Sequence, residues 1–114
     1  MTRSTAFALL CGLLAATLLA AGPAAAGDAA AGRKKAQVCQ PCHGLDGIAK
    51  IPMAPNLAGN NELYLRKQLE AFRSGQRTNE MMSVVAKGLS DADIANVAAW
   101  YSSIEITVKL PPAN

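Results

Sequence analysis

The sequence predicts an all-α fold of four to five short helices in a single domain over residues 27–114. Between residues 60 and 103, apolar side chains recur three or four positions apart, which is the spacing of one helix face. Two of these segments begin at Asn or Ser, and two stop at glycine. The predicted body has no segment in which apolar and polar residues alternate as they do in a strand.

The first 26 residues predict a cleaved signal peptide. A basic start at Arg3 is followed by an apolar run from Ala6 to Ala21 and by small residues up to Ala26. This order is typical of an exported protein, and a run of about 16 residues is short for a membrane span. We therefore expect cleavage after Ala25 or Ala26, a periplasmic location, and no stable membrane insertion of the mature chain.

The mature chain is predicted to begin with a helix from Ala29 to about Val38, with Asp28 as its N-cap. Gly32 lies inside this helix, where glycine lowers helix stability relative to alanine. Close approach by another helix would explain the glycine, and a frayed amino-terminal turn is the alternative.

A loop is expected from Gly44 to Gly59, because glycine and proline recur there and helical periodicity stops. A loop of about 16 residues is long for a compact domain unless it has a function.

Three helices are predicted after this loop, over residues 60 or 61 to 74, 80 to 87, and 91 to 103. Gly75 and Gly88 end the first two. Ser90 caps the last helix, with Asp93 in position for a capping box. The side chains expected on buried faces are Leu65, Leu69, Phe72, Ile94, Val97, Ala98 and Tyr101.

The tail, residues 104–114, is expected to be loosely ordered and contains a Pro-Pro pair near its end. Its apolar residues Ile104, Ile106 and Val108 alternate with polar ones, so an extended segment lying against the body is an alternative.

The clearest chemical motif is the run Cys39-Gln40-Pro41-Cys42-His43, which is the attachment signature for c-type haem. Two residues between the cysteines form one tight turn, so the two thiols can reach two vinyl groups of one macrocycle. His43 is then left beside the ring, with its imidazole able to point at the iron. A covalent haem would also add core volume to a domain of about 88 residues.

A thiol redox pair, a zinc site or a disulfide would account for the two cysteines less well. A thioredoxin-like redox pair requires a βαβ context, and a zinc site requires four ligands, whereas the mature chain has two cysteines and one histidine. A disulfide between Cys39 and Cys42 would close a very small loop and stabilise little.

Charge gives little information about partners. Without Arg3, the mature segment has ten Lys and Arg against eight Asp and Glu, and two haem propionates would bring its net charge close to zero. No basic stripe is interleaved with aromatic residues, so nucleic-acid binding is not expected.

The candidates for a second iron ligand are the methionines Met53, Met81 and Met82, since the mature chain has no second histidine. Met53 lies in the loop that must also contact the face of the ring on which His43 lies. Met81 and Met82 follow a full helix, which is enough chain to reach the far face of the ring, and only one of two adjacent residues can ligate. Ordinary core packing of both is the alternative. In the loop, the carbonyl of Pro55 is a candidate acceptor for Nδ1–H of His43. The alternative is that Pro55 only stiffens a turn.

Together these residues resemble the class I c-type cytochromes, in particular one haem domain of the dihaem c-four group. The resemblance covers residues 27 to about 103, and only the tail has no counterpart. The matching segments are Gly27–Gly32, Cys39–Gly44, Pro55–Gly59, Tyr64–Leu69, Phe72–Gly75, Met82–Asp91 and Ala98–Trp100.

The resemblance implies the cytochrome c fold, with the helices wrapped around one covalently bound haem c. It implies that Met82 is the axial ligand opposite His43 and that Pro55 accepts from the haem histidine. The first and last helices of this fold cross, and Gly32 and Trp100 match their contact positions.

The expected function is one-electron transfer by a soluble periplasmic monohaem protein that is not an enzyme, with redox proteins as donor and acceptor. The loop from Ile48 to Ala54 is a candidate docking surface. The alternative, which the apolar tail favours, is a haem c subunit of a larger oxidoreductase. A haem enzyme or gas sensor would require Met82 not to be a ligand.

Overall fold

The computed structural model describes residues 25–113, and this range contains helices and no strand. The predicted all-α class is confirmed for this part of the chain. The expected signal peptide lies outside the described residues except for Ala25 and Ala26. No helix within the described range is long and apolar enough to cross a membrane. In chain order the elements are α1 (Ala29–Lys35), the 3₁₀ turn η1 (Ala36–Val38), α2 (Gln40–His43), α3 (Glu62–Ser74), α4 (Glu80–Lys87) and α5 (Asp91–Ser102).

The helix predicted from residue 29 to 38 consists of two pieces. Asp28 caps α1 by accepting hydrogen bonds from the backbone N–H groups of Ala30 and Ala31. After Lys35 the backbone tightens into η1, and the N–H of Cys39 donates to the carbonyl of Ala36 at 2.9 Å. This tighter turn leads directly into the short helix α2.

The first and last helices pack against each other at Gly32. A Cβ at this position would lie 1.8 Å from the backbone oxygen of Asn96, so only glycine permits this approach. At the start of α1, the N–H of Asp28 donates to Oδ1 of Asn96 at 2.8 Å. The close approach expected from the sequence is therefore present, and α1 is anchored on α5.

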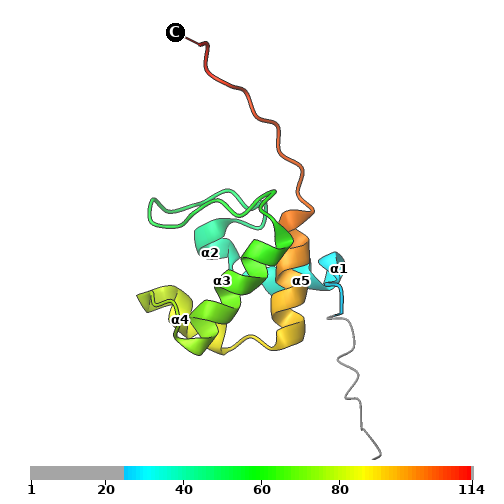
Figure 1. Cartoon of the computed structure of the whole chain (residues 1–114), viewed down its shortest axis with the longest axis vertical. Coiled ribbons are helices and arrows are strands. Elements are labelled where there is room, and N and C mark those ends of the chain that lie inside the picture. The colour runs from blue at the N-terminus through cyan, green and yellow to red at the C-terminus, as the bar shows by residue number, and fades with distance from the viewer. Residues whose placement is uncertain (1–24, 114) are drawn as a thin grey trace, which may run out of the picture.

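The core lies where α5 packs against α1, η1 and α3, with α3 and α5 side by side in Figure 1. Its buried residues are Ala36, Leu65, Val97, Ala98 and Tyr101, and partly buried side chains that include Cys39 of the cysteine motif and Leu45 and Leu57 of the loop pack against them. The cysteine motif therefore rests on the core.

The later helices have the boundaries that their caps predict. The side chain of Asn61 caps α3 by accepting a hydrogen bond from the N–H of Tyr64, and Gly75 ends the helix with φ +82°. Ser90 and Asp93 form the predicted capping box of α5, with hydrogen bonds of 3.0 Å in each direction.

The tail leaves the helical body after Ile104, which packs against the core. Ile106 passes close to Gly59, but Val108 and Leu110 are 70% and 79% exposed. Figure 1 shows the described tail running away from the helices. The alternative of an extended tail that packs against the body therefore applies to its first residues and not to the later ones.

Replacing Gly32 with alanine tests the contact between α1 and α5. Helix propensity alone would stabilise the protein by about 1 kcal/mol. The clash with Asn96 should instead lower the free energy of unfolding, by about 1–3 kcal/mol for overpacking. Chemical denaturation of the haem-loaded protein measures the difference, and a stabilised Gly32→Ala variant would contradict this packing.

Candidate functional site

The cysteine motif forms one helical turn. The N–H groups of Cys42 and His43 donate to the carbonyl of Cys39 at 3.3 and 2.9 Å, and that of Gly44 donates to Gln40 at 3.0 Å. Residues three apart on such a turn share a face, so Cys39 and Cys42 lie on the same side of α2. Gly44 ends the turn with φ +72°, and a Cβ there would lie 2.5 Å from the backbone oxygen of Ile48.

The imidazole of His43 is 7% exposed and is held by one contact to the loop. Its Nδ1 lies 2.9 Å from the carbonyl oxygen of Pro55. A carbonyl can only accept a hydrogen bond, so in the neutral imidazole Nδ1 carries the proton and Nε2 has the free lone pair. This is the arrangement in which a histidine binds a metal through Nε2 while its other nitrogen is held by a backbone oxygen.

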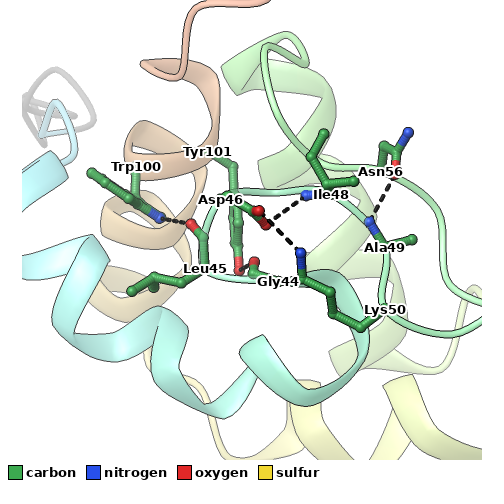
Figure 2. Close-up of polar contacts among 9 residues, drawn as sticks. All are labelled: Gly44, Leu45, Asp46, Ile48, Ala49, Lys50, Asn56, Trp100 and Tyr101. Atoms are coloured by element: carbon green, nitrogen blue, oxygen red, sulfur yellow. Dashed lines mark hydrogen bonds and ion pairs between the residues drawn. The ribbon is translucent and has the colours of Figure 1, made fainter.

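The loop that carries Pro55 is tied back to the turn that contains the cysteine motif. The N–H of Lys50 donates to the carbonyl of Cys42 at 2.8 Å. Oδ1 of Asn56, the residue next to Pro55, accepts from the N–H of Ala49 at 2.8 Å (Figure 2). These contacts fix the position of the Pro55 carbonyl relative to His43.

Asp46 orders the tight bend between the turn and this loop (Figure 2). Its carboxylate accepts from the N–H of Ile48 at 3.1 Å and pairs with Nζ of Lys50 at 3.0 Å. The backbone hydrogen bond, followed by that from Lys50, holds the pKa of Asp46 below its usual value. The carboxylate therefore stays ionised in this bend at neutral pH.

The last helix holds the segment after His43 through two aromatic donors (Figure 2). The hydroxyl of Tyr101 donates to the carbonyl of Gly44 at 3.0 Å, and Nε1 of Trp100 donates to the carbonyl of Leu45 at 3.0 Å. Tyr101 is fully buried, and burial raises its pKa far above the usual value. It therefore acts as a neutral donor. The sequence predicts both aromatics in helix packing, and it does not predict these hydrogen bonds to the turn.

The environment of Cys39 differs from that of a redox-active thiol. Cys39 and Cys42 are both free and partly exposed. Burial raises the pKa of the Cys39 thiol to about 11, partly offset by the hydroxyl of Tyr101. Redox-active cysteines generally have a lowered pKa, and burial shifts the pKa of Cys39 in the opposite direction. Within residues 25–113, no three His, Cys, Asp or Glu residues are grouped to hold a metal ion, so a zinc site is not supported either.

The three methionines of the mature chain differ in exposure. Met53 is 86% exposed and Met81 is 64% exposed, whereas Met82, the next residue in α4, is half-buried. In the view of Figure 1, α4 and α2 both lie on the side of α3 away from α5. Of the predicted site residues, Cys39, Cys42, His43 and Pro55 are together in one unit, and Met82 is on a separate helix.

These residues fit a covalently attached haem. The two thiols share one face of a helical turn, and the next residue offers an imidazole nitrogen whose partner nitrogen is already hydrogen-bonded. Large apolar side chains remain exposed around this site and on α4, among them Ile48, Met81 and Val84.

Comparison with known proteins also indicates a haem protein. The model of a family described as cytochrome C oxidase, cbb3-type, subunit III matches residues 22–100. Cytochrome c-554(548) of Halomonas halodenitrificans is 49% identical over 74 residues, which cover 62% of this chain and 89% of that protein.

Solved structures with a similar fold include a cytochrome c4 and a thiosulfate dehydrogenase. Reduced cytochrome c4 from Pseudomonas stutzeri has a TM-score of 0.67 and 40% identity, and the match covers 73% of this chain and 48% of that one. Thiosulfate dehydrogenase (TsdBA) from Marichromatium purpuratum has a TM-score of 0.63 and 36% identity, and the match covers 68% of this chain and 19% of that one. The chain thus spans about half of the cytochrome c4 and a smaller part of the dehydrogenase.

Replacing Tyr101 with phenylalanine tests the tie between α5 and the turn. The buried carbonyl of Gly44 would lose its donor, so the free energy of unfolding should fall by about 1–3 kcal/mol. The control is Tyr64→Phe, because Tyr64 is half exposed and should change stability by less than about 0.5 kcal/mol. Equal effects of the two variants in thermal denaturation would contradict a role for the Tyr101 hydroxyl.

Proposed function

The chain belongs to the c-type cytochrome family, and from this premise we propose that it transfers electrons with His43 and Met82 as the two axial ligands of its haem c. Proteins of this family are electron-transfer haem proteins, and the haem c is covalently bound. Bound haem supplies one-electron exchange between ferrous and ferric iron. What we propose is the assignment of these particular residues to the haem.

The observation that carries the proposal is the hydrogen bond between Nδ1 of His43 and the carbonyl of Pro55, at 2.9 Å. It leaves Nε2 as the only ring nitrogen with a free lone pair, on the residue directly after Cys42. The thiols of Cys39 and Cys42 would form the thioethers, and the hydrogen bond would keep the imidazole in one orientation during electron exchange.

The opposite ligand is proposed to be the thioether of Met82. This methionine is the less exposed of the adjacent pair, and it is the one that the family resemblance selects. A soft sulfur opposite a histidine favours the ferrous state and raises the reduction potential.

The proposed location is the periplasm, after removal of residues 1–26. Its basis is the order of basic, apolar and small residues at the amino terminus. A haem protein exported in this way would act as a soluble carrier that is not itself an enzyme, meeting redox proteins through brief contacts.

The proposed docking surface is the loop from Ile48 to Ala54. Ile48 is 47% exposed and Met53 is 86% exposed. The N–H of Lys50 ties the loop to the carbonyl of Cys42 in the haem-binding turn, so a partner that contacts the loop would lie close to the proposed cofactor attachment site.

A second candidate function is that of a haem subunit in a larger oxidoreductase. Thiosulfate dehydrogenase (TsdBA) contains a domain of this fold, and the matching family is named after an oxidase subunit. The exposed apolar tail is the part of this chain that would contact such a partner. A stable complex with a second polypeptide, dissociated by Val108→Lys, would favour this function over that of a free carrier.

Replacing Met82 with alanine should abolish the weak far-red absorption band by which methionine sulfur on ferric haem is recognised. The reduction potential should fall, by a sizeable share of the roughly 0.8 V over which axial ligands set haem potentials. The control is Met81→Ala, which should keep the band and the potential. Loss of the band in Met81→Ala and its retention in Met82→Ala would reverse the assignment.

Replacing Ile48 with lysine should slow electron self-exchange between two copies of the protein, because like charges would meet at the docking surface. We expect a decrease of roughly tenfold at low salt, equivalent to about 1.4 kcal/mol in the barrier, and a smaller decrease at high salt. Val108→Lys places the same charge on the exposed tail and is the control. Self-exchange that is unchanged in Ile48→Lys would contradict docking through this loop.

A further inference from the structure

Few side chains of the helix that carries Met82 are buried against the rest of the protein. Helix α4 is eight residues long, and Ala86 is its one buried residue. Isolated helices shorter than about 12–15 residues are marginal in water. The stability of α4 therefore depends on the contacts at its ends and on its packing against α3.

Met82 occupies the third position of α4, where the backbone N–H has no partner within the helix. That N–H donates to Oδ1 of Asn79 at 3.0 Å, and the same oxygen accepts from the N–H of Met81 at 3.1 Å. The N–H of Met82 is therefore bonded by the side chain of the N-cap residue.

Ser83 also contributes to the cap by forming hydrogen bonds with the backbone of Asn79. The N–H of Asn79 donates to Oγ of Ser83 at 3.1 Å, and the N–H of Ser83 donates to the carbonyl of Asn79 at 2.9 Å. Asn79 and Ser83 thus hold each other on either side of the methionine pair. Neither side chain is buried, so core packing does not account for the positions of Asn79 and Ser83.

The chain that leads into this cap is attached to α3. The N–H of Arg77 donates to the carbonyl of Ala71 at 3.0 Å, and its guanidinium lies over the ring of Phe72, 4.5 Å from the centroid. At the other end of α4, Nη1 of Arg73 donates to the carbonyl of Leu89 at 3.0 Å. These contacts fix where α4 begins and ends, and the cap decides whether its first turn is helical.

We propose that Asn79 is a positioning residue for the thioether of Met82: its side chain keeps the first turn of α4 formed and thereby keeps the sulfur on the iron. This inference rests on the proposed ligation by Met82. Loss of the cap would let the first turn open, so that the sulfur leaves the iron for a larger fraction of the time.

The expected size of the effect follows from the contribution of N-caps to helix stability. Replacing an Asn cap with alanine destabilises a helix enough to raise an opening equilibrium by about 5- to 30-fold. The fraction of ferric protein with the methionine detached should rise by this factor in Asn79→Ala, while the closed state keeps its spectrum.

The experiment is a titration of the full-length ferric haem protein with imidazole, which replaces methionine on the iron only when the sulfur has left. Apparent affinity for imidazole scales with the detached fraction. It should rise about 5- to 30-fold in Asn79→Ala and stay within about twofold of the wild type in Asn79→Asp, because Asp is also a good cap. Ser83→Ala, a milder change, should fall between these values.

The chain offers a matched control at Asn61, which caps α3 by accepting from the N–H of Tyr64 at 3.1 Å. Asn61→Ala removes an equivalent cap from a helix that carries no proposed ligand. It should lower the melting temperature to a similar extent and leave the imidazole affinity unchanged. Equal imidazole affinities in Asn79→Ala, Ser83→Ala and Asn61→Ala would overturn the inference and leave Asn79 as an ordinary cap.

Failure of the proposed ligation would be recognised separately. If the wild-type ferric protein lacks the far-red methionine band, or keeps it in Met82→Ala, then ligation by Met82 is wrong and this inference falls with it. If the band is present and depends on Met82, the imidazole titration alone decides the role of Asn79.

Discussion

The hydrogen bond between the imidazole of His43 and the carbonyl of Pro55 is the contact on which the rest of the site depends. It joins the imidazole to a proline carbonyl within the long loop that follows His43, and it assigns the two ring nitrogens different roles. The loop must then be folded so that one proline carbonyl meets one imidazole. Lys50, Asn56 and Asp46 supply the hydrogen bonds that fold it. Tyr101 and Trp100 fix the start of the loop to the last helix.

The two proposed iron ligands are held in physically different ways. His43 is buried, and the turn that carries it rests on the core formed by α5, η1 and α3. Met82 is half-buried on a short helix that is held by a cap and by arginine contacts at its ends. The histidine side should therefore open only with global unfolding, whereas the methionine side can open locally at a lower free energy. Such a difference would make Met82, of the two proposed ligands, the one that leaves the iron more often.

The sequence predicted those parts of the fold that depend on local chemistry. The caps at Asp28, Asn61 and Ser90 and the stop at Gly75 are short-range hydrogen-bond and backbone rules, and they are where they were expected. The approach of a helix to Gly32 was also predictable, because glycine inside a helix needs a packing reason. The hydroxyl of Tyr101 and the indole of Trp100 could not be assigned to carbonyls more than fifty residues away, because no local pattern encodes such a distant pair. The cap at Asn79 was not predicted, although an asparagine directly before a predicted helix is a recognisable N-cap signal.

The most direct test of the ligand assignment is a proton NMR spectrum of the ferrous protein with selectively labelled methionine methyl groups. A thioether bound to the iron lies over the haem ring, so its methyl resonance is shifted far upfield by the ring current. The assignment predicts one such resonance, belonging to Met82, with Met53 and Met81 at ordinary positions. A shifted resonance from Met81 or Met53, or none at all, would contradict it.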